Sequence, residues 1–343
     1  MYNNIINPND GKTVCIDSKI GKKILYNYLI NMIGGGISKQ KTINDVDIYY
    51  VNLEKDIDRK NKLENNLKLL NLTNIRRIPG IYGKNLKDNN YRKEISNLLE
   101  IESTKLTPEY FSKKSNFSCM TRKIEDILPK VGCYLAHLSA LKSAYENKLD
   151  SLLLLEDDAI ILPSILNNSE IFNHPSDADI VYFGGTFSHN KVDKDPLFNE
   201  KLNSKFIKID PKYLTLFGVF GLYIPSFEKI KDMYNVYKSV FLDGTSNLSK
   251  KKWKDKTDNE WRSGNIRMMA CLSDRMLTKY FQNFGNTYVL NPVVVYHDMD
   301  NKSNLSDSKK YRSQQKAMSF IYDSSQQEYI DNQLSLLNKK LIR

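Results

Sequence analysis

The feature that most constrains the fold is a strand, an amphipathic helix and a second strand in direct succession. "DVDIYYVNL" is rich in β-branched and aromatic residues, which is typical of a buried strand. "DIDRKNKLENNLKLLNL" follows it and carries four apolar residues at helical spacing: Ile57, Leu63, Leu67 and Leu70. "NIRRIPGIYG" is the second strand. A strand–helix–strand unit predicts a parallel sheet with helices on its faces.

The later segments continue this alternation. "VGCYLAHLSALKSAYENKL" predicts a helix that leads into the apolar strand of "SLLLLEDDAII". A strand ending in a glycine turn is predicted for "DADIVYFGGT", and a strand, turn and helix for "LTLFGVFGLYIPSFEKIKDMYNVY". A further helix is predicted for "CLSDRMLTKYFQNF", and one late strand for "TYVLNPVVVYHDMD". We therefore expect an α/β fold with a mostly parallel central sheet flanked by helices.

The chain divides into three parts. Residues 1–44 predict a separate N-terminal extension of unassigned role, and residues 45–305 the main domain. Residues 87–130 are polar and mixed, which favours an insertion in that domain. Residues 306–343 are charged and rich in Gln and Ser, and we expect a peripheral helical tail.

Composition excludes several classes of protein. With 41% hydrophobic residues among 343, the chain can bury a large core. The net charge of +11 comes from scattered lysines, so nucleic-acid binding is not favoured. The four cysteines (Cys15, Cys119, Cys133, Cys271) form no close pair, which argues against structural zinc and a disulfide framework. Without a signal peptide or about 18 consecutive apolar residues, we expect a soluble, cytoplasmic protein; its oligomeric state is not specified.

Three consecutive acids, Glu156, Asp157 and Asp158, end the apolar strand. Strand side chains alternate, so Glu156 and Asp158 should share one face, with Asp157 opposite. Such oxygen ligands suit Mg²⁺ or Mn²⁺, and His297, after the late strand, would favour Mn²⁺. The alternatives are a solvated turn or a helix N-cap before "AIILPSIL".

Other candidate residues lie near strand ends, where open α/β sheets bind ligands. Asn52 and Leu53 end the first strand. Gly184 and Gly185 would let a sugar approach the backbone, or would only make a turn. His137 lies on an apolar helix and is either a core histidine or a substrate contact.

Two blocks of the chain resemble glycosyltransferase family 25, which includes lipooligosaccharide galactosyltransferases and collagen hydroxylysine galactosyltransferases. The first block is Val51-Asn52-Leu53, Arg59 and Gly83-Lys84-Asn85-Leu86. The second, more specific block is "GCYLAHLSALKSAYENKLDSLLLLEDDAII". Ala136, in place of a serine, and Tyr82, in place of an aspartate, depart from the family pattern.

This resemblance implies a Rossmann-like, GT-A-type glycosyltransferase with a UDP-hexose donor and Mn²⁺ or Mg²⁺. It places Asn52, Leu53 and Arg59 at the uridine and its phosphates. Asp158, Glu156 and His297 would bind the metal, with Asp157 competing with Glu156 for the second acidic role. Asp274 matches the downstream acid that acts as general base in an inverting transfer, although it also fits an ordinary N-cap.

The leading hypothesis is a metal-dependent transfer of galactose or glucose from a UDP-sugar to a hydroxyl of a glycan or of a hydroxylysine-type acceptor. The first alternative is a protein of reduced activity on the same fold that still binds nucleotide sugar or glycan. A metal-dependent phosphohydrolase or nuclease is the third. It lacks the second carboxylate cluster that a two-metal site needs.

Overall fold

The computed structural model describes residues 4–6, 13–18, 20–22, 24–25, 41–113, 124–166, 168–188, 204–210, 215–243, 277–282, 285–298 and 324–341. The chain forms two compact units, Met1–Thr42 and Ile43–Arg343. In the first unit, β1 (Asn4–Ile6) and β2 (Thr13–Cys15) pair in antiparallel orientation. The second unit contains all the elements described below.

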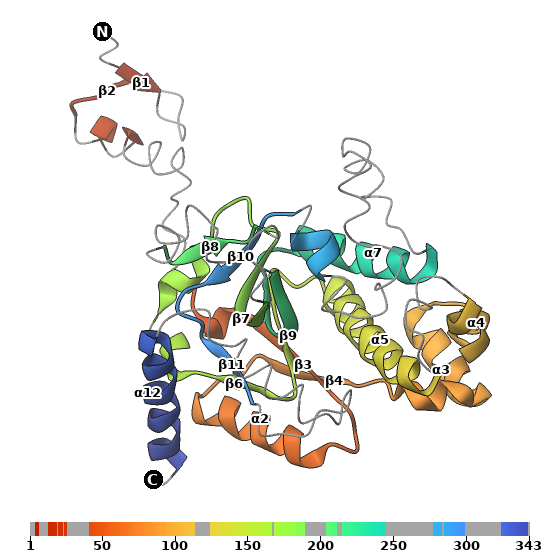
Figure 1. The fold of residues 1–343 in the computed structure, drawn as a ribbon. Coiled ribbons are helices and arrows are strands. Elements are labelled where there is room, and N and C mark those ends of the chain that lie inside the picture. Colours follow the sequence, from red (N-terminus) through yellow and green to blue (C-terminus); the bar gives the residue numbers. More distant parts are fainter. Residues whose placement is uncertain are drawn as a thin grey trace. The chain divides into compact units, whose positions relative to one another are not determined.

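A seven-stranded sheet with the order β4-β3-β5-β9-β7-β10-β8 forms the centre of the second unit (Figure 1). Its strands are β3 (Asp47–Asn52), β4 (Ile75–Pro79), β5 (Leu152–Glu156), β7 (Ile180–Ser188), β8 (Phe206–Lys208), β9 (Thr215–Ile224) and β10 (Thr287–Leu290). The pairs β4–β3, β3–β5 and β7–β10 are parallel, and β5–β9, β9–β7 and β10–β8 are antiparallel. The α/β, Rossmann-like class is confirmed. Five of the seven strands run in one direction, as a mostly parallel sheet requires, and β9 and β8 run against them, so the sheet is mixed.

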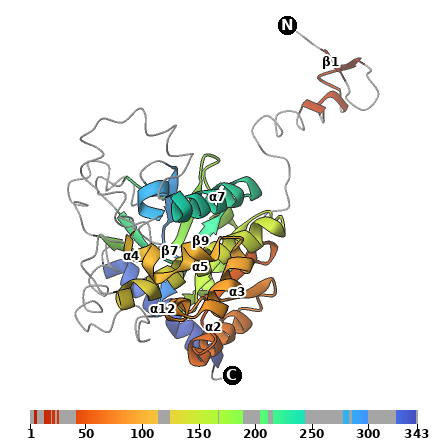
Figure 2. The same ribbon diagram turned by 90° about the vertical axis from the view of Figure 1, so that its right-hand side faces the viewer.

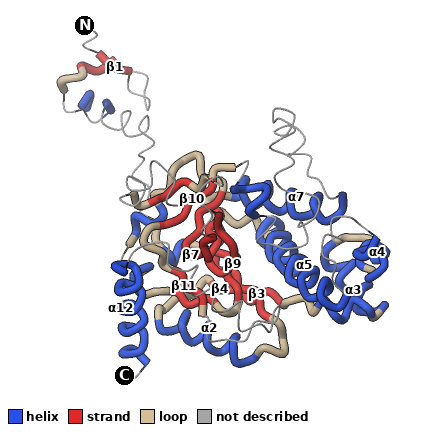
Figure 3. The backbone as a smooth tube through the Cα atoms, viewed as in Figure 1, coloured by secondary structure: helices blue, strands red, loops and turns tan. Residues whose placement is uncertain are grey.

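Helices cover both faces of this sheet. Helices α5 (Ile124–Glu146) and α7 (Phe227–Asp243) lie on one face, and α2 (Ile57–Leu69) and α12 (Ser324–Leu341) on the other (Figures 1 and 2). Figure 3 shows the strands as a central layer between these helices. The residues of β5 alternate between the two cores: Leu152 and Leu154 join the core under α5, whereas Leu153 and Leu155 join the core under α2. This alternation is what allows one strand to be apolar throughout.

The segment expected to be an insertion contributes to the α5 core. It forms α3 (Asn89–Leu99) and α4 (Pro108–Lys113), joined by the 3-10 helix Ser103–Leu106. The buried apolar residues of α3, α4 and the turns between them are Ile95, Leu99, Ile101, Leu106 and Phe111. Although polar in composition, the segment therefore packs its few apolar residues against the main domain.

Two glycines let the 3-10 helix Gly83–Lys87 approach α5 closely. A Cβ on Gly83 would lie 1.7 Å from the carbonyl oxygen of Leu128, and a Cβ on Gly132 would lie 2.3 Å from that of Ile81. Both contacts involve backbone, which cannot move aside cheaply. Gly83 of the "GKNL" block and Gly132 of the "GCYLAH" block therefore allow these two segments to pack directly against each other.

The expectation of one late strand is wrong. β10 ends at Leu290, the Asn291–Pro292 peptide bond is cis, and a separate strand β11 (Val295–His297) follows. Proline has no N–H for a sheet ladder, so the strand is interrupted there. β11 pairs in antiparallel orientation with β6 (Ala159–Ile161), outside the main sheet, and this pairing sets His297 opposite Ala159.

The turn expected at Gly184 and Gly185 is also wrong, because β7 continues through both glycines to Ser188. The expected strand, turn and helix after residue 213 are present as β9 and α7. A helix lies within the tail, as expected, and α12 packs against α2. Among the described residues, no helix is long and apolar enough to span a membrane.

Candidate functional site

The three acids lie where β5 ends and turns into β6. Glu156 is the last residue of β5, and Asp157 and Asp158 form the turn. A strand follows this turn, so the alternative of a helix N-cap is wrong. The predicted pairing of Glu156 with Asp158 is also wrong: Asp157 and Asp158 both contact Arg59, whereas Glu156 faces His137. Alternation holds only while the chain is a strand, and it stops at Glu156.

Asp157 is held by two partners. Its Oδ2 accepts a hydrogen bond of 2.8 Å from Asn52 Nδ2, and its Oδ1 lies 2.8 Å from Arg59 Nη2. Burial raises the pKa of Asp157 to about 6, and the neighbouring Asp158 adds to the rise, while Arg59 and Asn52 oppose it. Both carboxylate oxygens are occupied, which makes Asp157 an anchor for the turn.

Asp158 lies between two basic side chains. Its Oδ2 contacts Arg59 Nη2 and lies 3.2 Å from His297 Nε2. Burial alone would raise the pKa of this carboxyl, but the hydrogen bond and charge of His297, with the charge of Arg59, hold it below its ordinary value. Asp158 Oδ1 is buried and has no hydrogen-bond partner in the described part of the chain. Asp158 therefore stays ionised and keeps one oxygen for a further ligand.

A second arginine, Arg77 on β4, holds Asn52 in place. Its Nε donates to Asn52 Oδ1 over 3.1 Å, and its Nη2 donates to the Asn52 carbonyl oxygen over 3.4 Å. Asn52 in turn donates to Asp157 and is itself buried. Sequence reasoning missed Arg77; the available signal was a charged residue inside the short strand "IRRIP".

His297 is positioned by stacking and by the β6–β11 pair. Its ring lies 4.9 Å from that of Phe220 at an interplanar angle of 17°. The next residue, Asp298, donates its backbone N–H to the Asp158 carbonyl oxygen over 2.7 Å and pairs with Lys62 of α2. These contacts bring together two segments far apart in the sequence.

On the α5 side, Glu156 meets His137. Glu156 Oε1 lies 3.4 Å from His137 Nε2, and His137 Nδ1 donates to the carbonyl oxygen of Cys133 over 2.9 Å. Burial lowers the pKa of His137 to about 4, although its bond to the Cys133 carbonyl opposes the shift, so the imidazole is neutral at pH 7. His137 is thus a buried histidine, but one that faces a carboxylate.

The remaining predicted site residues are placed as follows. Leu53 directly follows β3 and packs near Gly80, where a Cβ would lie 2.9 Å from the Leu53 nitrogen. A Cβ on Gly184 would lie 2.0 Å from the Val295 carbonyl oxygen, so β11 fills the space beside this glycine. Gly185 follows it in β7 and is half-buried. Asp274 lies outside the described residues.

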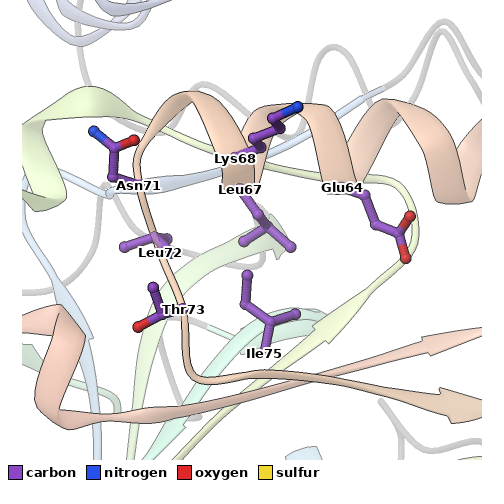
Figure 4. Close-up of a pocket in the computed structure, with 7 residues that line it drawn as sticks. All are labelled: Glu64, Leu67, Lys68, Asn71, Leu72, Thr73 and Ile75. Atoms are coloured by element: carbon purple, nitrogen blue, oxygen red, sulfur yellow. The ribbon is translucent and has the colours of Figure 1, made fainter.

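A surface pocket of about 390 Å³ lies elsewhere, beside the end of α2 (Figure 4). It is lined by Glu64, Leu67, Lys68, Asn71, Leu72, Thr73 and Ile75. Ile75 pairs with Ile48 at the amino ends of β4 and β3, whereas Asn52 and Asp157 lie at the carboxyl ends. The pocket is therefore separate from the acidic turn.

The site thus lies at the carboxyl ends of adjacent parallel strands of a Rossmann-like α/β sheet, where acids and an asparagine meet an arginine from the first turn of α2. Residues 45–212 match glycosyltransferase family 25, described as LPS biosynthesis protein, and this part of the chain belongs to that family. The resemblance read from the two motif blocks is confirmed. No curated protein matches the chain. The match includes Asn52, Arg59 and the acidic turn, and it ends before Asp274 and His297.

Proposed function

We propose that this protein is a metal-dependent glycosyltransferase that moves a hexose, galactose or glucose, from a UDP-sugar to a hydroxyl group. The family supplies the class of reaction, glycosyl transfer in LPS biosynthesis. The metal, the donor and the acceptor are proposed from the site. The observation that carries them is the pairing of Asp158 with His297 at the end of β5.

A divalent ion fits the residues present. Asp158 Oδ2 and His297 Nε2 lie 3.2 Å apart, a separation that two ligands of one ion also have when each bond is about 2.1 Å. Asp158 Oδ1, which has no hydrogen-bond partner among the described residues, offers another ligand oxygen. A carboxylate combined with an imidazole favours Mn²⁺ over Mg²⁺. Glu156 is turned toward His137, so Asp158 and His297 are the ligands that we propose.

Arg59 and Asn52 would receive the donor. Both lie at the carboxyl ends of parallel strands or at the start of the helix that follows, the usual place for a nucleotide in open α/β sheets. Arg59 is already shared between Asp157 and Asp158, so its charge lies next to the proposed metal ligands. The guanidinium is suited to phosphate oxygens. Leu53, at the end of β3, would border the uridine.

In the transfer, the bond between the anomeric carbon and the diphosphate oxygen breaks, and a bond to the acceptor oxygen forms. The metal, when bound, supplies Lewis-acid stabilisation of the leaving UDP. The acceptor hydroxyl loses its proton to a carboxylate on the opposite side of the sugar, which gives inversion. Asp274 remains our prediction for that base. The family description favours a glycan over a hydroxylysine-type acceptor.

Thermal unfolding with UDP, GDP and CMP, each with and without Mn²⁺, tests the proposal. We expect UDP with Mn²⁺ to raise the melting temperature, because a ligand of the folded state alone stabilises it by about 2.7 kcal/mol at one hundred times its dissociation constant. Asp158→Ala should abolish this shift. Asp177→Ala is the matched control, since Asp177 is an exposed acid that pairs with Lys208 away from the turn. Absence of any nucleotide shift with any metal would remove the basis of the proposal.

Turnover separates the enzyme from a catalytically reduced binding protein on the same fold. We expect slow hydrolysis of UDP-galactose or UDP-glucose, and faster release of UDP once a glycan acceptor is added. Asp274→Asn should reduce transfer to the acceptor more than hydrolysis, because water can react without a base. Binding of UDP with neither hydrolysis nor transfer would favour the alternative.

A further inference from the structure

We propose that Cys133, His137 and Glu156 form a second metal site, for an ion of the zinc class, on the α5 side of the acidic turn. This site goes beyond the proposed transferase function, which uses Asp158 and His297. Cys133 and His137 lie on α5, and Glu156 ends β5. An ion there would tie the helix directly to the end of the strand.

The spacing of the three residues fits one ion. Cys133 and His137 are four residues apart, so they lie on the same face of the helix. Each of the three residues offers one ligand atom, and these atoms all lie within 4.8 Å of one another. The metal site proposed at Asp158 and His297 uses different atoms, so both sites can be filled at once.

The hydrogen bond of His137 prepares its outer nitrogen for an ion. A backbone carbonyl can only accept, so Nδ1 carries the proton in the 2.9 Å bond to the Cys133 carbonyl oxygen. Nε2 then presents a lone pair to Glu156 Oε1 at 3.4 Å. Two acceptors facing each other repel, and a cation between them removes the repulsion. A metal-binding histidine typically donates its other N–H to a carbonyl or carboxylate in this way.

The ligand types select the ion. A thiolate with an imidazole and a carboxylate suits Zn²⁺ and is a poor match for Mg²⁺, which prefers oxygen alone. Three protein ligands leave the fourth tetrahedral position open. Cys133 and Glu156 are both half-buried, so water can reach that position, while His137 is buried. The site therefore has the donor set of an accessible, three-ligand zinc centre.

Cobalt titration of the metal-free protein tests this proposal. Co²⁺ replaces Zn²⁺ in such sites and gives a thiolate-to-cobalt charge-transfer absorption that oxygen and nitrogen ligands do not produce. We expect one equivalent of Co²⁺ to bind with this absorption, and Zn²⁺ to displace it. Cys133→Ser should abolish the absorption, and Glu156→Gln should weaken Co²⁺ binding by about tenfold or more, since changes even beyond the direct ligands have that effect.

Two control variants isolate the site. A variant with Cys15, Cys119 and Cys271 all changed to Ser should keep the absorption, because Cys133 remains. Asp158→Asn should also keep it, which separates this site from the proposed donor site. No thiolate absorption at one equivalent of Co²⁺, or an absorption that survives Cys133→Ser, would overturn the proposal. If Cys133→Ser fails to fold by circular dichroism, unchanged Co²⁺ affinity in Glu156→Gln would overturn it instead.

Discussion

The acidic turn has two sides that treat neighbouring carboxylates in opposite ways. Toward α2, Asp157 and Asp158 meet Arg59, and Asp158 also meets His297. Toward α5, Glu156 meets a buried, neutral His137. Arg59 and His297 hold the pKa of Asp158 below its ordinary value, whereas the side chain that Glu156 faces is a neutral imidazole.

The position of a carboxylate in the fold, more than its residue type, sets its pKa and its partners. Asp157 and Asp158 are adjacent and chemically identical, yet burial raises the pKa of Asp157 while basic neighbours lower that of Asp158. The α2 side is organised by charge pairs and the α5 side by close packing and a histidine hydrogen bond. Substitutions on the α2 side should therefore lower stability through lost charge pairs, and substitutions on the α5 side through disturbed packing.

The largest effect is expected on the α2 side, for Arg59→Met. This change keeps most of the side-chain volume but leaves Asp157 and Asp158 without their shared cation, and breaking a buried pair in this way costs about 3–5 kcal/mol of the free energy of unfolding. Urea denaturation measures it. Lys60→Met, on the same helix, is the control, because its pair with Glu64 is exposed and is worth about 0.5 kcal/mol. Equal effects of the two changes would show that Arg59 does not hold the turn.

On the α5 side, Gly132→Ala should act through packing alone. The new Cβ would lie 2.3 Å from the Ile81 carbonyl oxygen, so α5 or the Gly83 segment must shift, at about 1–3 kcal/mol. Ser143→Ala on the same helix should change stability by less than about 0.5 kcal/mol. Thermal unfolding compares them. If Gly132→Ala weakens Co²⁺ binding but preserves the UDP-dependent shift in melting temperature, the two sides of the turn act independently.

Asn52→Ala should have an intermediate effect. It removes the amide that donates to Asp157 and accepts from Arg77, and unpaired buried groups of this kind cost about 1–3 kcal/mol. The matched control is Asn74→Ala, whose amide makes an exposed hydrogen bond to the Asn44 carbonyl oxygen. Chemical denaturation should show a clear loss for the first variant only. A neutral result at Asn52 would mean that Arg59 alone orients Asp157.

The smallest effect is expected for Glu156→Gln in the absence of metal. The side chain of Glu156 is 29% exposed and its partner His137 is neutral, so removing the charge should change the free energy of unfolding by less than about 1 kcal/mol. Denaturation in a chelating buffer measures this. A loss of unfolding free energy as large as that of Arg59→Met would show that charge pairs stabilise both sides of the turn.

Much of the fold could be predicted from local patterns. The hydrophobic periodicity of the sequence correctly predicted five elements: β3, α2, β4, α5 and β5. Each of them buries apolar residues that recur at helical or strand spacing. One detail of α2 was wrong: Ile57 fits the helical spacing but is 59% exposed, since it begins the helix beyond the edge of the core. The reversed direction of β9 was not predicted, because nothing in the composition of this strand shows its direction.

The site was only partly predictable. Asn52 and the acids were found, since charged and amide groups next to an apolar strand stand out from their surroundings. Arg59 was found through its place in the family motif. The separation of Glu156 from Asp158 was not, because the end of a strand depends on how the next segment pairs. The β6–β11 pairing brings His297 to Asp158, and it joins segments that are far apart in the sequence.

The α/β class, the family and the candidate residues can all be derived from the amino-acid sequence, because amphipathic spacing and short motifs are local properties. Which side chains meet depends on the folded chain. It joined Asp158 to His297, placed Arg77 behind Asn52 and turned Glu156 toward His137 and Cys133. The physical reason is that a carboxylate's pKa and partners are set by groups distant in sequence, which only packing brings within a few ångströms.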